Sequence, residues 1–270
     1  MLVVEVNANR IRQGLNSVCE AKKNIVMGSL VELQQHFLSE SYPTLLAIES
    51  SGATCGVALA KGSCCWTAVN GATHDHSAVL TLLIEAVLQA ASVESDSLQA
   101  IALSEGPGSY TSLRIGFATA KGIAYAVGCP LIAVPTLESL ASLMASRLSS
   151  ALSPAVLMPM IDARRMEVYT QPYSVGLDPL EAPSARIFDG ATAPFFAGYA
   201  PAVFGGPGAE KGRDYLETLG LSFLSDVMLT AEALLPLALR RFRQGDFAST
   251  AYLEPLYLKE FVAIPAKKKI

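Results

Sequence analysis

The feature that most constrains this fold is a glycine-rich turn between a predicted strand and a predicted helix. The turn, Ser104 to Gly116, reads SEGPGSYTSLRIG. It follows the apolar run 100–103 and leads into the small residues of Ser112 to Val127. Such a turn collects backbone N–H groups at a helix N-terminus, where negative charge is stabilised. Two interpretations are open: a phosphate-binding loop, or an ordinary tight turn before a capped helix.

The turn differs from the two most familiar phosphate-binding motifs. A P-loop needs a Gly-Lys-Ser/Thr triplet, which is missing, and Thr111 stands where a dinucleotide-binding fingerprint has its third glycine. We therefore predict a vestigial nucleotide or phosphate site, built from this turn, the end of the first predicted strand and a second glycine turn. Its residues are Glu49, Ser50, Ser51, Gly106, Gly108, Ser109 and Gly206.

Composition narrows the class of protein. The chain has 270 residues, of which 51% are hydrophobic and 16% charged, so it can bury a large core. No apolar run approaches the roughly 18–20 residues of a membrane span, and a net charge of −4 gives no overall positive field for nucleic acid. Five cysteines without a Cys-x-x-Cys pair indicate reduced thiols and a cytoplasmic protein.

The first half reads as strands followed by alternating helices and strands, which is the order of a ribonuclease H-like α/β domain with a mixed sheet. Turns at 51–54 and 61–63 separate three successive strands. The predicted strands are Thr44–Ser50, Cys55–Lys61, Ser63–Val69, Ala100–Leu103 and Leu131–Val134. The predicted helices are His76–Ala91, Ser112–Val127 and Thr136–Leu148, the last with Thr136 as its N-cap.

The second half reads as a shorter, degenerate copy of the first. The predicted strands Ala155–Ile161 and Met166–Gln171 flank the charged turn 162–165. That turn is either a salt-bridged element, shaping the cleft between lobes or contacting a partner, or a simple polar hairpin turn. The remaining elements are a helix after the glycine turn 205–208, a helix Thr230–Arg243 that Pro236 kinks or breaks, and an extended segment Leu256–Phe261.

These patterns divide the chain into four parts. They are an N-terminal extension (1–43), a first lobe (44–150), a second and degenerate lobe (151–262) and a basic tail (263–270). We expect the extension to be an appendage, either disordered or an over-long start with Met27 as the true initiator. Within it, Gly28–Ser39 predicts a short helix, and Pro43 breaks the chain before the first strand.

Separated motifs keep a common order along the chain. They are Leu46–Ser51, the hairpin Cys55–Lys61, His76-Ser77, the glycine turn with its helix (SEGPGSYTSLRIGFATAKGIA), Val134–Glu138 and Ile161–Tyr169. Together they resemble the bacterial TsaB family, also called YeaZ, from about residue 44 to Lys259. This resemblance implies two ribonuclease H-like lobes of the actin-like ATPase (ASKHA) superfamily, with mixed sheets flanked by helices.

The resemblance also implies a function in tRNA modification. TsaB proteins are non-catalytic partners and activators of TsaD, which transfers the threonylcarbamoyl group when threonylcarbamoyladenosine is made beside the anticodon of tRNAs. For this chain, the resemblance implies a heterodimer with TsaD, a ternary complex with the small ATPase TsaE, and indirect contact with tRNA. A homodimer of the isolated chain is also implied, with no cofactor beyond weakly bound ATP or ADP at the complex junction. The lysines at 267–269 either reach tRNA phosphates or are solvated.

The catalytic groups that an active relative needs are scarce. The three histidines, His36, His74 and His76, lack the His-x-x-x-His spacing that puts two imidazoles on one helix face, so we predict no metal site and no catalytic residue. Glu49 and Asp162 end predicted strands, where an actin-like kinase places its acids, yet the turn after Glu49 has no basic residue for phosphates. The alternatives are a small-molecule kinase of the actin-like ATPase class and a glycoprotease-like metallopeptidase.

Two helices predict a partner surface. The helix 76–91 is apolar around nearly its whole circumference, and the helix 112–127 carries small residues that allow close approach. We expect the pair to form a four-helix interface with another subunit; the alternative is that the two helices cover only each other and the sheet. The expected interface residues are His76, Leu80, Leu83, Ile84, Val87, Leu113, Gly116, Phe117 and Ala120.

Overall fold

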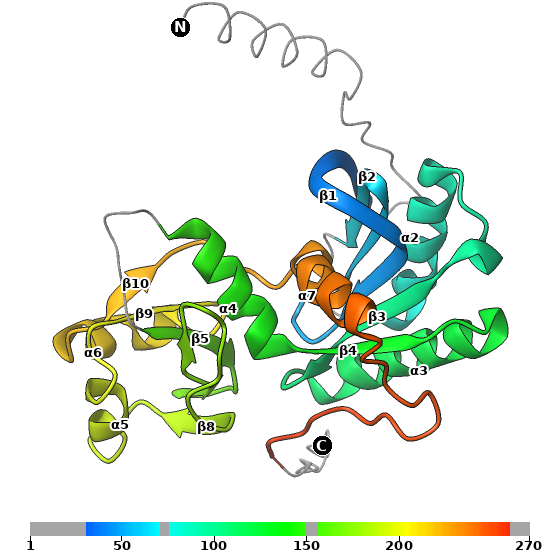
Figure 1. Cartoon of the computed structure of the whole chain (residues 1–270). Helices are drawn as coiled ribbons and strands as arrows, with labels where there is room; N and C mark the ends of the chain where they lie inside the picture. The colour runs from blue at the N-terminus through cyan, green and yellow to red at the C-terminus, as the bar shows by residue number, and fades with distance from the viewer. Residues whose placement is uncertain (1–30, 71–75, 149–155, 260–270) are drawn as a thin grey trace, which may run out of the picture.

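The chain forms two lobes, each a β-sheet flanked by helices (Figure 1). The computed structural model describes residues 31–70, 76–148 and 156–259. The predicted mixed α/β class with two lobes is confirmed. Within these residues, none of the helices has the length and apolar content needed to cross a bilayer.

The first lobe contains a four-stranded sheet in the order β2-β1-β3-β4. Strand β1 pairs antiparallel with β2 and parallel with β3, and β3 pairs parallel with β4. This mixed sheet agrees with the predicted order of elements. The elements are β1 (Val31–Glu49), β2 (Gly56–Asn70), α2 (His76–Ala91), η1 (Ser95–Ser97), β3 (Ala100–Gly106), α3 (Tyr110–Val127), β4 (Leu131–Pro135) and α4 (Thr136–Arg147).

The second lobe contains a mixed sheet in the order β10-β9-β5-β6-β8, with β7 also paired to β5. The predicted strand pair around 162–165 is confirmed as the antiparallel pair β5–β6, and β9 is the parallel neighbour of β5. The elements are β5 (Val156–Asp162), β6 (Glu167–Thr170), β7 (Tyr173–Ser174), β8 (Ser184–Ile187), α5 (Ala193–Ala197), β9 (Ala202–Gly205), η2 (Glu210–Gly212), α6 (Arg213–Thr218), β10 (Ser222–Leu224) and α7 (Ala231–Gln244).

Helices cover both faces of the first sheet, which is why its strands are apolar runs. Successive side chains of a strand point to opposite faces. Leu46 and Ile48 of β1 therefore lie in the core under α2 and α3, whereas Leu45 and Ala47 lie in the core under α7.

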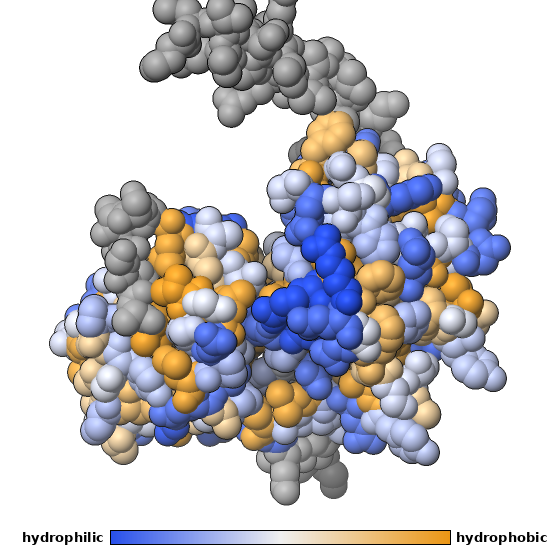
Figure 2. Space-filling model, in the orientation of Figure 1, coloured by the Kyte–Doolittle hydropathy of each residue, from blue (hydrophilic) through white to orange (hydrophobic). Residues whose placement is uncertain are grey.

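One helix from each half of the sequence packs against the sheet of the other half. Helix α4 follows the first sheet in sequence, yet its Leu137 and Leu140 pack with Leu157 of β5. Helix α7 follows the second sheet, yet its buried leucines pack on the first sheet. Glu138 of α4 joins the two helices through ion pairs with Arg240 and Arg241 of α7, 2.7 and 2.6 Å long. Figure 2 shows hydrophilic residues gathered over α7, where the lobes meet.

The predicted helix at Gly28–Ser39 is wrong for the residues that the structure describes, since Val31–Glu49 is one long strand with register shifts around Tyr42. Pairing with β2 and ion pairs with α7 explain the difference. His36 lies 2.7 Å from Glu232, and Glu40 lies 3.0 Å from Arg243. Pro43 lies within the strand instead of ending it. Residues 1–30, including Met27, lie outside the described residues.

Three further local predictions are corrected. The expected turn at 61–63 is part of a continuous β2, where Gly62 pairs with Tyr42. Helix α7 continues through Pro236, because the leucines on both sides of this proline are buried against the first sheet. Thr136 is the first residue of α4 and not its N-cap; its hydroxyl accepts a hydrogen bond from the amide of Gly106, 3.0 Å away.

Candidate functional site

The two lobes carry the same Gly-Pro-Gly sequence after equivalent strands. Gly106-Pro107-Gly108 ends β3, Gly206-Pro207-Gly208 follows β9, and the first glycine of each has positive φ, 116° and 117°. A Cβ at Gly108 would lie 2.5 Å from the carbonyl oxygen of Ser51, and one at Gly208 would lie 2.6 Å from the carbonyl carbon of Ile161. Only glycine fits such close backbone approaches. Each turn therefore packs on the end of its lobe's first strand.

In the first lobe, this packing encloses Glu49. The Oε1 atom of Glu49 accepts hydrogen bonds from the amide and hydroxyl of Ser51, at 2.7 and 2.5 Å, and its Oε2 atom has no partner among the described residues. Burial raises the pKa of Glu49 above its ordinary value, although the hydrogen bonds from Ser51 and the nearby Ser104 hydroxyl act in the opposite direction. Only 2% of the Glu49 surface is exposed.

Two N–H groups of the predicted phosphate cradle already have protein partners. The amide of Ser109 donates to the carbonyl of Ser51 at 2.8 Å, and the amide of Gly106 donates to Thr136. The structure brings together six predicted residues, Glu49, Ser50, Ser51, Gly106, Gly108 and Ser109, whereas Gly206 lies in the other lobe beside Met160. Nucleotide binding at these residues stays a prediction.

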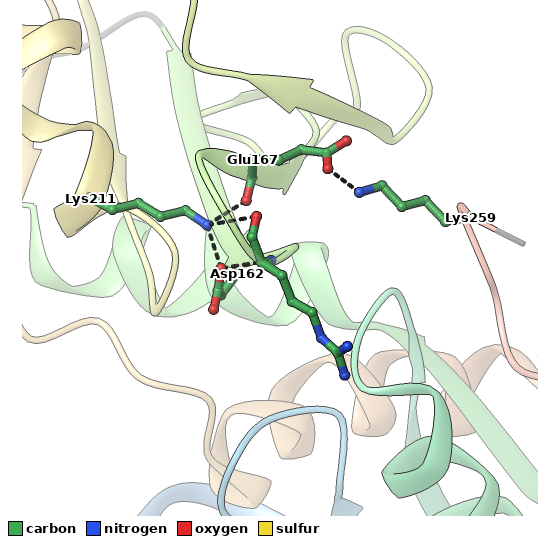
Figure 3. Close-up of polar contacts among 5 residues, drawn as sticks. Asp162, Glu167, Lys211 and Lys259 are labelled. Atoms are coloured by element: carbon green, nitrogen blue, oxygen red, sulfur yellow. Dashed lines mark hydrogen bonds and ion pairs between the residues drawn. The ribbon is translucent and has the colours of Figure 1, made fainter. Parts of the chain in front are cut away.

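In the second lobe, the equivalent acid is Asp162, which lies at the end of β5 (Figure 3). It pairs with Lys211, whose Nζ also donates to the carbonyl of Glu167 at 2.6 Å. The Glu167 carboxylate in turn pairs with Lys259. The turn 162–165 is thus salt-bridged, and it is also the hairpin turn between β5 and β6; its expected part in a cleft or a partner contact stays a prediction. Lys211 and Lys259 were missed, because no local pattern links a lysine to an acid 49 or 92 residues away.

A metal site does not fit the described residues. No group of three His, Cys, Asp or Glu side chains among them is close enough to hold a metal ion. His76 is buried at the start of α2, and its Nε2 lies 3.1 Å from the carbonyl oxygen of Ala53. His74 lies outside the described residues.

The expected interface residues of α2 and α3 lie inside the chain's own core. On α2 the buried side chains recur every three or four residues and form one stripe toward the sheet, so α2 is not buried on all sides. A partner on this face would meet the outer residues, such as Ala78 and Thr81 of α2 and Ala118 and Tyr125 of α3. The buried residues are His76, Leu80, Leu83, Ile84, Val87, Leu113, Gly116, Phe117 and Ala120.

A groove of about 620 Å³ runs beside the C-terminal half of α2. Its lining combines apolar Leu88 and Ile123 with acidic Glu85 and Glu94. The groove adds a concave surface to the outer face of the two helices.

The segment after α7 contacts both lobes. Its Leu256 amide donates to the Glu105 carbonyl at 2.8 Å, and the rings of Tyr257 and Tyr110 lie 4.5 Å apart, so the segment lies on the first lobe. Three residues after Leu256, Lys259 reaches Glu167 of the second lobe. The backbone of Leu256 also leaves no room for a side chain at Gly106.

Comparisons with known proteins agree with this architecture. The model of a family described as "TsaD: tRNA N6-adenosine threonylcarbamoyltransferase" matches residues 70–207, just over half of the chain. The tRNA threonylcarbamoyladenosine biosynthesis protein TsaB of Escherichia coli is 27% identical over 235 residues, which cover 83% of this chain and 99% of that protein. TsaB of Bacillus subtilis is 32% identical over 131 residues, 48% of this chain and 55% of the relative's length.

Solved structures of similar fold also include YeaZ proteins. YeaZ from Pseudomonas aeruginosa superposes with a TM-score of 0.68 at 26% identity, covering 80% of this chain and all of that one. A Pseudomonas aeruginosa protein described as similar to peptidase YEAZ gives 0.69 at 25% identity, covering 81% of this chain and all of that one. Fold and matches define a two-lobed α/β protein of the TsaD-related class. Within that class, the chain belongs to the TsaB (YeaZ) family of tRNA threonylcarbamoyladenosine biosynthesis.

Proposed function

We propose that this chain is the non-catalytic partner and activator of a TsaD threonylcarbamoyltransferase in the formation of threonylcarbamoyladenosine in tRNA. One observation carries the non-catalytic part: neither acid that could serve catalysis is open to a substrate. Glu49 is only 2% exposed beneath the Ser51 turn, and Asp162 is paired with Lys211. A base or metal-binding carboxylate must reach the substrate or metal. The family relationship supports the pathway.

The partner surface in this proposal is the outer face of α2 and α3, where the chain forms a heterodimer with TsaD, which TsaE joins. Small or aromatic exposed side chains on α3, such as Ala118 and Tyr125, allow a second helix pair to approach. The same face would serve a homodimer of the isolated chain.

The tRNA is the substrate of the complex. Cytoplasmic location fits the free thiols, of which Cys55 and Cys65 are buried.

Reconstitution tests the proposal directly. Unmodified tRNA transcript, TsaD, TsaE, threonylcarbamoyl adenylate and this chain are combined, and each protein is left out in turn. We expect modified tRNA only when this chain is present, and co-elution of the chain with TsaD in size-exclusion chromatography. Full modification without the chain would overturn the proposal.

A second measurement separates the alternatives. ATP hydrolysis by the chain alone, lost in Glu49→Ala or Asp162→Ala, would favour a small-molecule kinase. A metal ion bound in stoichiometric amount would favour a metallopeptidase. We expect neither in the purified chain.

A further inference from the structure

The turn between β5 and β6 is held in one shape from within. The Nζ atom of Lys211 pairs with Asp162 and also approaches the carbonyl oxygens of Glu167 and Arg164, at 2.6 and 3.5 Å (Figure 3). Across the turn, the amide of Ala163 donates to Glu167 at 3.0 Å, and the amide of Glu167 donates to Arg164 at 3.2 Å. A lysine ammonium thus occupies the inside of the turn and satisfies its carbonyl groups.

This scaffold presents two arginines outward. Arg164 and Arg165 both have positive φ, 69° and 47°, a conformation that costs energy for residues other than glycine. Both side chains are exposed. Lys211 neutralises Asp162, and Lys259 neutralises Glu167. The two arginines are therefore surplus positive charge at this place.

Unpaired arginines are exceptional in the described part of the chain. Among the described residues, the charged groups of the other lysines and arginines contact an acid, a carbonyl oxygen or an aromatic ring, with Lys61 as the exception. The guanidinium groups of Arg164 and Arg165 make no such contact with the described residues. Since nearly every other cation has an internal role, this pair is available to an external anion.

We propose that Arg164 and Arg165 bind phosphate groups of tRNA, so that this chain contacts the RNA directly. The planar guanidinium matches phosphate geometry, and two adjacent arginines can meet successive phosphates of one strand. This inference rests on the proposed function, because that function supplies the RNA.

The test measures binding of an unmodified tRNA transcript to the full chain with TsaD at several salt concentrations. In the variant Arg164→Ala/Arg165→Ala, we expect roughly tenfold weaker binding, and a salt dependence whose slope falls by about 1.5–2, the value for two lost phosphate contacts. The variant Arg164→Lys/Arg165→Lys keeps both charges and should keep the slope. Lys61→Ala removes another exposed cation, from the first lobe, and should change neither the affinity nor the slope. Thermal unfolding confirms that the variants are folded.

Three results would overturn the inference. The first two are unchanged affinity and slope in the double alanine variant, and an equal loss in Lys61→Ala. The third is weakened binding to TsaD with unchanged tRNA affinity, since the turn would then be a protein contact. If modification still requires the chain in these cases, the proposed function stands while the RNA contact fails. If modification never requires the chain, the proposed function itself has failed.

Discussion

Gly116 of α3 lies directly against Ser50 at the end of β1: a Cβ on Gly116 would lie 2.1 Å from the Oγ and 3.1 Å from the Cβ of Ser50. One residue comes from the expected partner surface and the other from the expected phosphate site. Their contact shows that the helix start and the strand end form one packed unit. Gly116 thus serves the chain's own core, and its small size lets α3 approach the sheet.

The first prediction concerns this contact. Gly116→Ala should destabilise the fold by about 1–3 kcal/mol, because the added methyl group overpacks a site where Ser50 is only 2% exposed. At Gly122 on the same helix, an added methyl group would have nothing within 4 Å, so Gly122→Ala should stabilise by about 0.5–1 kcal/mol through helix propensity. Urea unfolding of both variants is the measurement. Equal changes in the free energy of unfolding would show that Ser50 leaves room for a methyl group at position 116.

The second prediction concerns the buried carboxyl group of Glu49. Because burial raises its pKa, the folded state binds a proton more tightly than the unfolded state does. The free energy of unfolding should therefore fall as pH rises from the unfolded pKa, near 4.5, up to the raised folded value. Glu49→Gln removes this slope and keeps an acceptor for Ser51. Urea unfolding between pH 4 and 8 compares the two proteins, and parallel curves would contradict the prediction.

The third prediction concerns the ion pair of His36 with Glu232, which attaches β1 to α7. The carboxylate raises the pKa of His36, and the imidazolium lowers the pKa of Glu232. The histidine part of this stabilisation is present below pH ~6.5 and is lost as pH rises through the raised pKa; the glutamate part is lost as pH falls below ~4.5. The stability difference between the wild type and His36→Gln should thus be largest near pH ~5–6. A difference that does not change with pH would contradict it.

The apolar runs of the fold were predictable from the sequence. The range of α2 was predicted correctly from a long apolar stretch that contains no glycine or proline, and β3 and β4 begin where predicted because their runs are apolar and bounded by turn residues. The first half of β1 was not predicted as a strand, because apolar and polar residues do not alternate regularly in it. Its conformation depends on β2 and on ion pairs with α7, which lies far away in sequence.

The candidate site was predictable only in part. Glycine turns and acids at strand ends are local signals, and they correctly located Glu49, Ser51 and Gly108 at one place. The lysine partners of Asp162 and Glu167 depend on tertiary structure and leave no sequence signal. The partner residues of α2 and α3 were chosen by hydrophobicity, which selects the buried stripe instead of the outer face.

The fourth prediction concerns the segment after α7. Tyr257 is half-buried against Tyr110, so Tyr257→Ala should destabilise by about 1–2 kcal/mol and speed hydrogen exchange of the Leu256 amide, which is bonded to Glu105. Tyr252 lies in the same segment but is 86% exposed, so Tyr252→Ala should stay within about 0.5 kcal/mol of the wild type. Unchanged exchange at Leu256 in Tyr257→Ala would mean that the stacking does not hold the segment.

The fifth prediction separates the buried stripe of α2 from the outer face of the helix pair. Leu83→Glu places a charge at a fully buried site and should prevent folding, because an unpaired buried carboxylate is strongly unfavourable. Ala118→Glu changes an exposed residue of α3; the variant should fold normally and bind TsaD at least roughly tenfold more weakly. Ser225→Glu adds the same charge to an exposed position of the second lobe and serves as the matched control. Size-exclusion chromatography and thermal unfolding decide between the effects. Equal TsaD binding by Ala118→Glu and Ser225→Glu would move the partner surface away from α3.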